Sequence, residues 1–291
     1  MRPLERWLAA LFLVTLPACG SGAKAPAAAS TPEAIPPAPP EVRLHAFACG
    51  YAEIEDMALF GDESGPRELV APCYLIRHPR GTLLWDTGVD DTFAQTKGGV
   101  LDPRTRIRFR VETPLRDQLR ALHLAPADVT YVAFSHVHGD HAGNAALFPA
   151  STWILSRREL EWASTTPPPE SVAPGFLSTY PRVKMRLLDG DADIFGDGTV
   201  KIVATPGHTP GHQSLVVKLR RAGTLVISGD ACHTHGNWQH RRTPPFNTDR
   251  EESVRSMERL KGLVDASHAR FVVQHEPDEL DAFPRFPGFL D

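Results

Sequence analysis

The sequence predicts an α/β fold in which packed β-sheets are covered by outer helices within one domain. Short β-rich runs are spread along the chain from about residue 42 to the end, and they outnumber the helical stretches. The composition is that of a globular protein, with 42% hydrophobic and 23% charged residues. Because strands and helices must bury their apolar faces against each other, this pattern favours a layered single domain.

The first 19 residues, MRPLERWLAALFLVTLPAC, have the pattern of a secretory signal. Arg2 and Arg6 give a basic start, and the apolar run after them is shorter than the ~20 residues that span a bilayer. The end of this segment, LPAC, resembles a bacterial lipobox, in which the Cys becomes the lipidated first residue. We therefore expect an exported lipoprotein anchored through Cys19, in the outer membrane and facing the periplasm or the cell surface. Plain secretion is the alternative.

Residues 20–41 are rich in Ala, Pro and Ser and show no apolar periodicity. Such a segment is expected to be a disordered linker that tethers the following domain to the membrane. The folded domain is expected to occupy residues 42–291.

Strands are expected at residues 42–49, 69–77, 82–86, 131–135, 152–155, 200–205, 214–219, 224–228 and 270–274. Helices are expected at 114–122, 143–148, 156–164 and 249–266. The last helix has the clearest pattern, because its apolar residues fall on one face with charges opposite. Irregular loops at 94–110 and 165–181 are expected to lie over a functional site.

The run SHVHGDHAG, just after a β-rich segment, contains the strongest functional signal. His136 and His138 alternate along an extended segment, so both side chains point to the same side. Asp140 and His141 follow Gly139, which permits a sharp turn. Imidazole and carboxylate are ligands of zinc and related divalent ions. This spacing therefore predicts a metal site, because a chance cluster of surface histidines would rarely have it.

Three further segments place a candidate ligand where an apolar run ends in a loop. His208 lies in TPGHTPGH, Asp230 ends the run LVISGD, and His275 follows VVQ. Taken singly, a His after a strand is more often a hydrogen-bonded residue than a ligand. Together these residues predict one site at the strand ends, the usual place for a site in a layered α/β fold.

These motifs together resemble the metallo-β-lactamase fold, an αββα sandwich of two packed mixed sheets with outer helices. The resemblance runs from about residue 42 to the C-terminus and includes Asp86-Thr87-Gly88 after LLW. Within this superfamily the chain looks most like the N-acyl-homoserine lactonase group. That narrower resemblance rests on CYLIRHPRG before the Asp86 strand, on the doubled Pro-Gly-His followed by Gln-Ser, and on the final QHEP.

The resemblance implies a centre with two divalent metal ions. One ion would be held by His136, His138 and His208 and the other by Asp140, His141 and His275, with Asp230 bridging. Zinc is the default for such ligands, and iron, cobalt and manganese also suit them. A hydroxide shared by the metals would attack the lactone carbonyl, and Asp140 would relay a proton to the leaving alkoxide.

Five more residues have expected roles near this centre. Asp86 and His212 are expected to orient ligands rather than bind metal. Members of the lactonase group often carry a Tyr three residues after the bridging Asp, where it clamps the substrate carbonyl. His233 stands there, either as a replacement hydrogen-bond donor or as a polar loop residue. Trp238 and Phe246 are expected either to line an acyl pocket or to pack in the core.

With Cys19 lipidated, Cys49, Cys73 and Cys232 remain, and an odd number leaves at least one unpaired. Cys49 and Cys73 lie on early strands that could be neighbours, and we expect buried thiols there in preference to a disulfide. Cys232 adjoins the expected bridging Asp and is a candidate site of oxidation.

The expected function is hydrolysis of N-acyl-homoserine lactones, small molecules that the enzyme would open at the ring. The alternatives are a β-lactamase, a thioesterase, another ester hydrolase of this fold, or a non-catalytic metal-binding lipoprotein. β-Lactamases with this His motif generally lack the bridging Asp, and thioesterases of this type act on cytosolic substrates. A formal net charge of −4 with no long basic run argues against a nucleic-acid partner.

Overall fold

The structure of the protein is a computed structural model that describes residues 11–15 and 41–291. Cys19, the expected lipidation site, and nearly all of the expected linker lie outside the described residues. Residues 11–15 have no regular secondary structure, and residues 41–291 belong to one compact unit. Within the described ranges, no helix is both long enough and apolar enough to cross a membrane.

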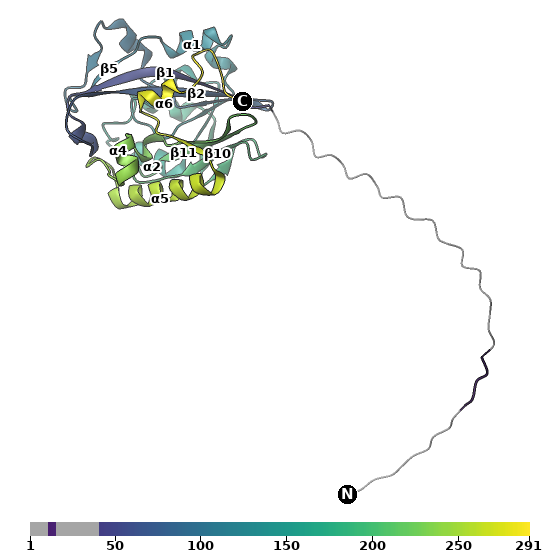
Figure 1. The fold of residues 1–291 in the computed structure, drawn as a ribbon. Coiled ribbons are helices and arrows are strands. Elements are labelled where there is room, and N and C mark those ends of the chain that lie inside the picture. The colour runs from purple at the N-terminus through teal and green to yellow at the C-terminus, as the bar shows by residue number, and fades with distance from the viewer. Residues whose placement is uncertain (1–10, 16–40) are drawn as a thin grey trace. The chain divides into compact units, whose positions relative to one another are not determined.

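The larger sheet has eight strands in the order β4-β5-β1-β2-β3-β6-β7-β8 (Figure 1). Its strands are β1 (Arg43–Ile54), β2 (Arg67–His78), β3 (Gly81–Trp85), β4 (Val100–Leu101), β5 (Arg108–Arg110), β6 (Tyr131–Ala133), β7 (Thr152–Ser156) and β8 (Met185–Leu188). The strands from β4 to β3 pair antiparallel, whereas β3, β6, β7 and β8 pair parallel.

The second sheet has five strands in the order β13-β12-β11-β10-β9. They are β9 (Ala192–Asp193), β10 (Val200–Ala204), β11 (Gln213–Leu219), β12 (Gly223–Ile227) and β13 (Arg270–Val272). Only β12 and β13 pair parallel in this sheet. The expected fold of two mixed sheets is therefore confirmed.

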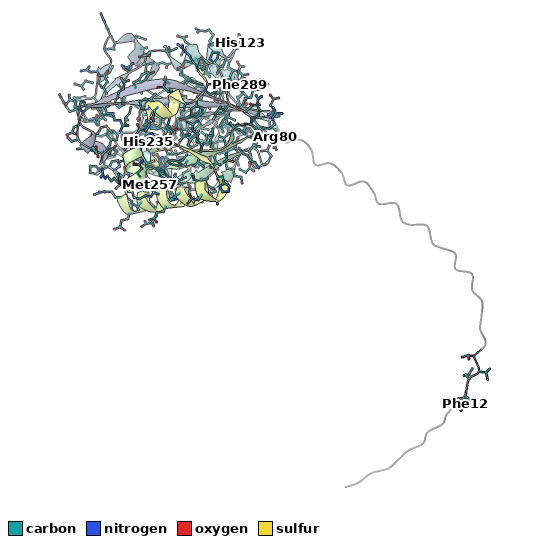
Figure 2. All side chains as sticks on the ribbon, in the orientation of Figure 1. Phe12, Arg80, His123, His235, Met257 and Phe289 are labelled. Carbon is teal, nitrogen blue, oxygen red and sulfur yellow. A yellow bond between two sulfur atoms is a disulfide. The ribbon has the colours of Figure 1, made fainter. Side chains whose placement is uncertain are left out.

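The helices are α1 (Leu115–Ala121), α2 (Arg157–Ala163), α3 (Pro174–Thr179), α4 (His235–His240), α5 (Arg250–Ser267) and α6 (Pro277–Asp281). Figure 1 shows α1 and α5 on opposite sides of the strands, as expected for outer helices. The side chain of Asp249 caps α5 by accepting a hydrogen bond from the Glu252 amide at 2.8 Å. The exposed Arg80 and His123 lie at the periphery of this unit (Figure 2).

Two apolar clusters hold the layers together. One contains residues of both sheets, such as Trp85, Ile202 and Leu215, which are all fully buried. The other contains Phe134 and Trp153 of the larger sheet region together with Leu115 of α1. Burial at these positions removes large apolar surfaces from water, which is the dominant favourable contribution to folding.

Some expected elements differ from those in the structure. The loop expected at 94–110 contains the β4–β5 hairpin, and the loop expected at 165–181 contains α3. The helix expected at 143–148 is only a 3-10 turn, Ala145–Leu147, because the preceding residues turn back to pack against the Gly88 loop. The long amphipathic helix α5 lies within one residue of its expected bounds.

The expectation of buried thiols at Cys49 and Cys73 is wrong, because these residues form a disulfide. Strands β1 and β2 are antiparallel neighbours whose register shifts after Ala48, and the two Cα atoms lie 5.8 Å apart. That distance falls within the range of disulfides. Cys232 is free and buried, and burial raises the pKa of its thiol, so the expected oxidation site is protected.

Candidate metal centre

The candidate ligands lie at the ends of strands from both sheets. The segment from His136 to His141 follows β6, and His208, Asp230 and His275 follow β10, β12 and β13. Their ligand atoms form overlapping groups within 4.8 Å of one another: His136, His138 and His208; His136, His141 and Asp230; Asp140, His141 and His275. The fold thus brings together all seven residues that the sequence indicated.

Three imidazoles converge in what we call the three-histidine half, formed by His136, His138 and His208. The Nε2 atom of His208 lies 3.2 Å from His136 Nε2 and 3.1 Å from His138 Nδ1. Burial lowers the pKa of His138 and of His208 to about 3, so both rings are neutral and present a lone pair. Neutral imidazoles that converge in this way fit a divalent ion.

The carboxylate half is formed by Asp140, His141 and His275. The Nε2 atoms of His141 and His275 are 3.2 Å apart, and Asp140 Oδ2 lies 3.6 Å from His141 Nε2. This mixed set of nitrogen and oxygen donors also fits a divalent ion.

Asp230 lies between the two halves. Its Oδ1 is 2.8 Å from His275 Nε2, and its Oδ2 is 3.3 Å from His208 Nε2. The surrounding histidines hold the pKa of this carboxyl well below its ordinary value, despite its burial. One carboxylate oxygen facing each half is the arrangement needed to bridge two ions.

Asp86 orients the carboxylate half. Its Oδ2 lies 2.9 Å from His141 Nδ1, and its carboxylate also accepts hydrogen bonds from the Ser135 amide and the Gln274 side-chain amide, each at 2.7 Å. A carboxylate on Nδ1 fixes the tautomer and leaves Nε2 free to bind metal. Asp86 has a left-handed backbone with φ 58°, which is unusual for a residue other than glycine.

His212 braces the backbone of Asp230 instead of contributing a ligand. Its Nε2 accepts a hydrogen bond from the Asp230 amide at 2.7 Å, and its Nδ1 donates to the Thr205 carbonyl at 2.9 Å. Both ring nitrogens are therefore engaged in positioning the bridging residue.

His233 is buried beside the bridging carboxylate. Its Nε2 lies 3.0 Å from Asp230 Oδ2, and its Nδ1 has no hydrogen-bond partner in the described part of the chain. Its ring packs against Phe60 and Phe246, and it lies parallel to the ring of His275 at 5.9 Å. His233 therefore faces the site and is not a solvated loop residue.

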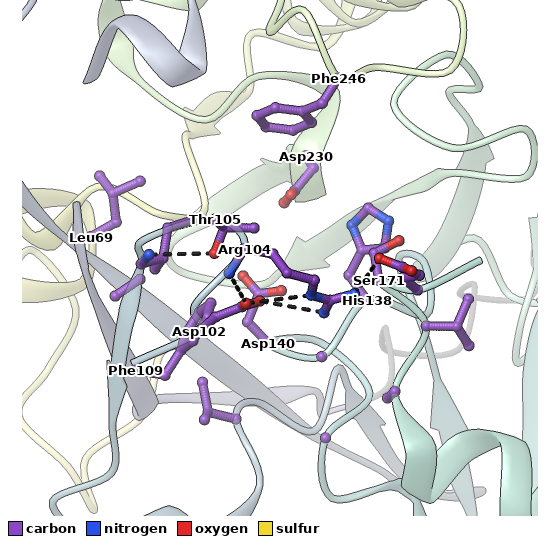
Figure 3. Close-up of a pocket in the computed structure, with 18 of the residues that line it drawn as sticks. Leu69, Asp102, Arg104, Thr105, Phe109, His138, Asp140, Ser171, Asp230 and Phe246 are labelled. Carbon is purple, nitrogen blue, oxygen red and sulfur yellow. Dashed lines mark hydrogen bonds and ion pairs between the residues drawn. The ribbon is translucent and has the colours of Figure 1, made fainter. Parts of the chain in front are cut away.

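A cavity of about 930 Å³ opens above the ligands (Figure 3). Its walls include Leu69 of β2, Phe109 of β5 and the expected Phe246, while Asp140 and Asp230 lie at its base. Arg104, at the tip of the β4–β5 hairpin, reaches Glu170 at 2.6 Å across the mouth. Trp238 instead stacks on Phe271 at 3.8 Å and is partly buried, so it packs against the core and not along the cavity.

Three residues that support the site were not predicted from the sequence: Glu159, Asn247 and Gln274. Asn247 Oδ1 accepts from His208 Nδ1 at 3.0 Å. Gln274 binds Asp86, and its position directly before a ligand at a strand end was the available signal. Glu159 lies in a run of mostly charged residues on an expected short helix, and no sequence pattern distinguishes it from its neighbours.

The chain belongs to the metallo-beta-lactamase superfamily, whose family model matches residues 66–266. The family and the hydrolase class expected from the ligand motif are thereby confirmed.

Curated relatives of the chain include N-acyl homoserine lactonases. The chain is 33% identical over 264 residues to the N-acyl homoserine lactonase AttM of Azorhizobium caulinodans, covering 86% of this chain and 99% of the relative. It is 27% identical over 222 residues to the N-acyl homoserine lactonase AiiA of Bacillus thuringiensis subsp. kurstaki, covering 75% and 86% of the two chains. A solved structure of a B. thuringiensis AiiA mutant with N-decanoyl-L-homoserine bound at the active site superposes with a TM-score of 0.73. That structure is 25% identical and covers 85% of this chain and 98% of its own.

Proposed function

We propose that this protein hydrolyses the lactone ring of N-acyl homoserine lactones at a centre of two metal ions. The observation that carries the proposal is the bridging Asp230 at the base of a largely apolar cavity. The cavity provides room for an acyl chain beside the reacting carbonyl, and the similarity to AttM and AiiA supports this substrate class.

Two divalent ions in this donor set would supply a nucleophile from water at neutral pH and polarise the carbonyl. Zinc is the proposed metal, because the donors are imidazoles and carboxylates. The remaining chemistry belongs to side chains of the protein. The carboxylate of Asp140 lines the cavity and can accept a proton from water and deliver it to the leaving alkoxide. His233 also lines the cavity, and its Nε2, 3.0 Å from Asp230 Oδ2, is the ring nitrogen that can donate a hydrogen bond to the carbonyl oxygen.

The cavity walls also support a preference for longer acyl chains. Leu59, Phe93, Ile107 and Phe109 provide apolar surface away from the ligands. Each methylene that moves from water to such a surface contributes up to about 0.8 kcal/mol. We therefore expect kcat/KM to rise from butanoyl to decanoyl substrates.

A pH-stat assay of ring opening, with zinc-loaded protein and acyl chains from butanoyl to decanoyl, tests this function. Turnover that disappears in Asp230→Ala would support the proposal. A wild-type protein that binds two zinc ions and opens none of these lactones would contradict it. Thioesters, β-lactams and other esters would then be assayed on the same preparation.

The proposed location is outside the cytosol, with a lipid on Cys19 as the anchor. The disulfide between Cys49 and Cys73 supports export, since disulfides form and persist in oxidising compartments. Membrane fractionation of cells fed a labelled fatty acid tests this location. Label and membrane association should both be lost in Cys19→Ser, and a wild-type protein without label would contradict the lipid anchor.

A further inference from the structure

Glu159 is a buried carboxylate on a helix that otherwise has an exposed, charged face. It lies in the first turn of α2, and its exposed fraction is 0%. The helix neighbours Arg158 and Glu161 are both exposed. The expected reaction assigns no role to Glu159.

Each oxygen of Glu159 accepts a hydrogen bond from a different ligand-bearing loop. Oε1 accepts from the amide of Val137 at 3.1 Å, and Oε2 accepts from the amide of Gly211 at 3.0 Å. Val137 stands between the ligands His136 and His138. Gly211 lies in the loop that carries His208. The carboxylate therefore spans the two segments that supply the three-histidine half.

Those two segments come from different sheets, since one follows β6 and the other follows β10. The spacing of 3.1–3.2 Å between the ring nitrogens thus depends on how the sheets are held together at this end. Gln213 joins the same segments on the far side of His136, through its amide to the Ser135 carbonyl at 2.8 Å. Glu159 is the corresponding link on the side of His138 and His208.

The contact between α2 and the His208 loop is close. A Cβ atom on Gly211 would lie 2.2 Å from the Glu159 amide nitrogen, so only glycine fits there. Burial raises the pKa of Glu159 to about 7, while the nearby Thr209 hydroxyl and the two amide donors oppose that rise. A buried carboxyl group is unfavourable without compensation, and these two hydrogen bonds are the compensation that the structure shows.

We propose that Glu159 is a positioning residue that sets the spacing of His136, His138 and His208, and so the affinity of that half for its ion. The inference rests on the proposed metal centre, but not on the identity of the substrate. It predicts that Glu159 acts on one half of the centre and leaves the other unchanged.

The test is a cobalt titration of metal-free protein, followed by visible absorption, in two ligand-deletion backgrounds. His275→Ala removes a ligand of the carboxylate half, and His208→Ala removes a ligand of the three-histidine half. Adding Glu159→Ala should weaken cobalt binding about 10- to 100-fold in the His275→Ala background, the range for outer partners of a ligand. In the His208→Ala background it should change the affinity less than about twofold.

Gln118→Ala is the matched control. Gln118 is also buried, and its amide donates to two backbone carbonyls, those of Ala48 and Thr113, at 2.7 and 3.0 Å. It should lower the melting temperature without changing cobalt affinity in either background. Glu159→Gln keeps one acceptor oxygen and should give an intermediate loss of cobalt affinity. If Glu159→Ala does not fold, the Glu159→Gln protein provides the test.

An unchanged cobalt affinity in both Glu159 variants, or an equal loss in the two backgrounds, would overturn the inference. Neither result depends on lactone turnover. A failure of the proposed substrate would therefore be seen separately in the pH-stat assay. A wild-type protein that binds no cobalt would overturn the metal centre and this inference together.

Discussion

Two buried carboxylates support the two halves of the metal centre, and they do so differently. Asp86 contacts a ligand ring directly, with Oδ2 at 2.9 Å from His141 Nδ1. Glu159 contacts only backbone amides beside the ligands of the three-histidine half. The first arrangement fixes the tautomer and orientation of one ring, whereas the second fixes the distance between two loops. One centre thus uses both ways of organising a metal site.

Removal of the residue shared by the halves should have the largest effect. Asp230→Ala should weaken binding of both ions by more than about 100-fold, because each half loses an oxygen donor and the ions lose a neutralising negative charge. Zinc content after dialysis, measured by elemental analysis, checks this expectation. Retention of two zinc ions would show that Asp230 does not bridge the halves.

Asp86→Ala should lower the affinity of the carboxylate half for its ion about 10- to 100-fold, because the His141 ring loses its hydrogen-bond partner. Cobalt titration in the His208→Ala background measures this half alone. Asp197→Ala is a suitable control. The Asp197 carboxylate also pairs with a histidine, with Oδ2 at 2.8 Å from His78 Nε2, but neither residue is a candidate metal ligand. Equal effects of Asp86→Ala and Asp197→Ala would remove the contrast between Asp86 and Glu159.

The disulfide should support the Asp86 side of the centre more than the Glu159 side. The amide of Val89, just beyond the Asp86 turn, donates to the Cys49 carbonyl at 3.1 Å. A Cβ atom on Gly88 would lie 2.1 Å from Cys49 Cβ, so the two segments are in tight contact. Replacing both Cys49 and Cys73 with Ser should lower the free energy of unfolding by about 2–4 kcal/mol.

Urea denaturation of the metal-free protein checks that loss of stability. Cobalt titration in the two ligand-deletion backgrounds shows which half of the centre loses more affinity when the disulfide is removed. A larger loss of affinity in the three-histidine half than in the carboxylate half would contradict the expected coupling.

The titration of Glu159 should affect stability without removing any contact of the centre. Burial raises its pKa to about 7, above the ~4.3 of an unfolded Glu. The folded state keeps a proton that the unfolded chain has already lost in this window, so the stability contributed by this group falls as the pH rises from about 4.3 to 7. Glu159→Gln cannot titrate there. The free energy of unfolding of the variant minus that of the wild type should therefore rise across this window and level off above it.

Urea denaturation of metal-free wild type and Glu159→Gln between pH 4.5 and 8 provides the comparison. A difference that falls with rising pH would mean that the carboxylate is ionised throughout and that its amide donors outweigh its burial.

Much of the fold and the ligand set could be predicted from local sequence. The spacing of His136, His138 and His141 is short-range, and α5 repeats its apolar residues at helical intervals. Glu159 and Asn247 could not be found in this way, because the loops that they contact are distant in the sequence and meet only in the folded protein. The disulfide was missed for a related reason, since the pairing of β1 with β2, in which Cys73 lies opposite Phe47 and so near Cys49, is a property of the folded sheet.

The β4–β5 hairpin has a consequence for how this enzyme can change. It supplies much of the cavity wall but no metal ligand, and β5 joins the larger sheet only through its pairing with the far end of β1. Substitutions along the hairpin can therefore reshape the space above the ions without moving the ions themselves. Natural or laboratory evolution can therefore change substrate preference through this hairpin while the metal ligands and the reaction stay the same.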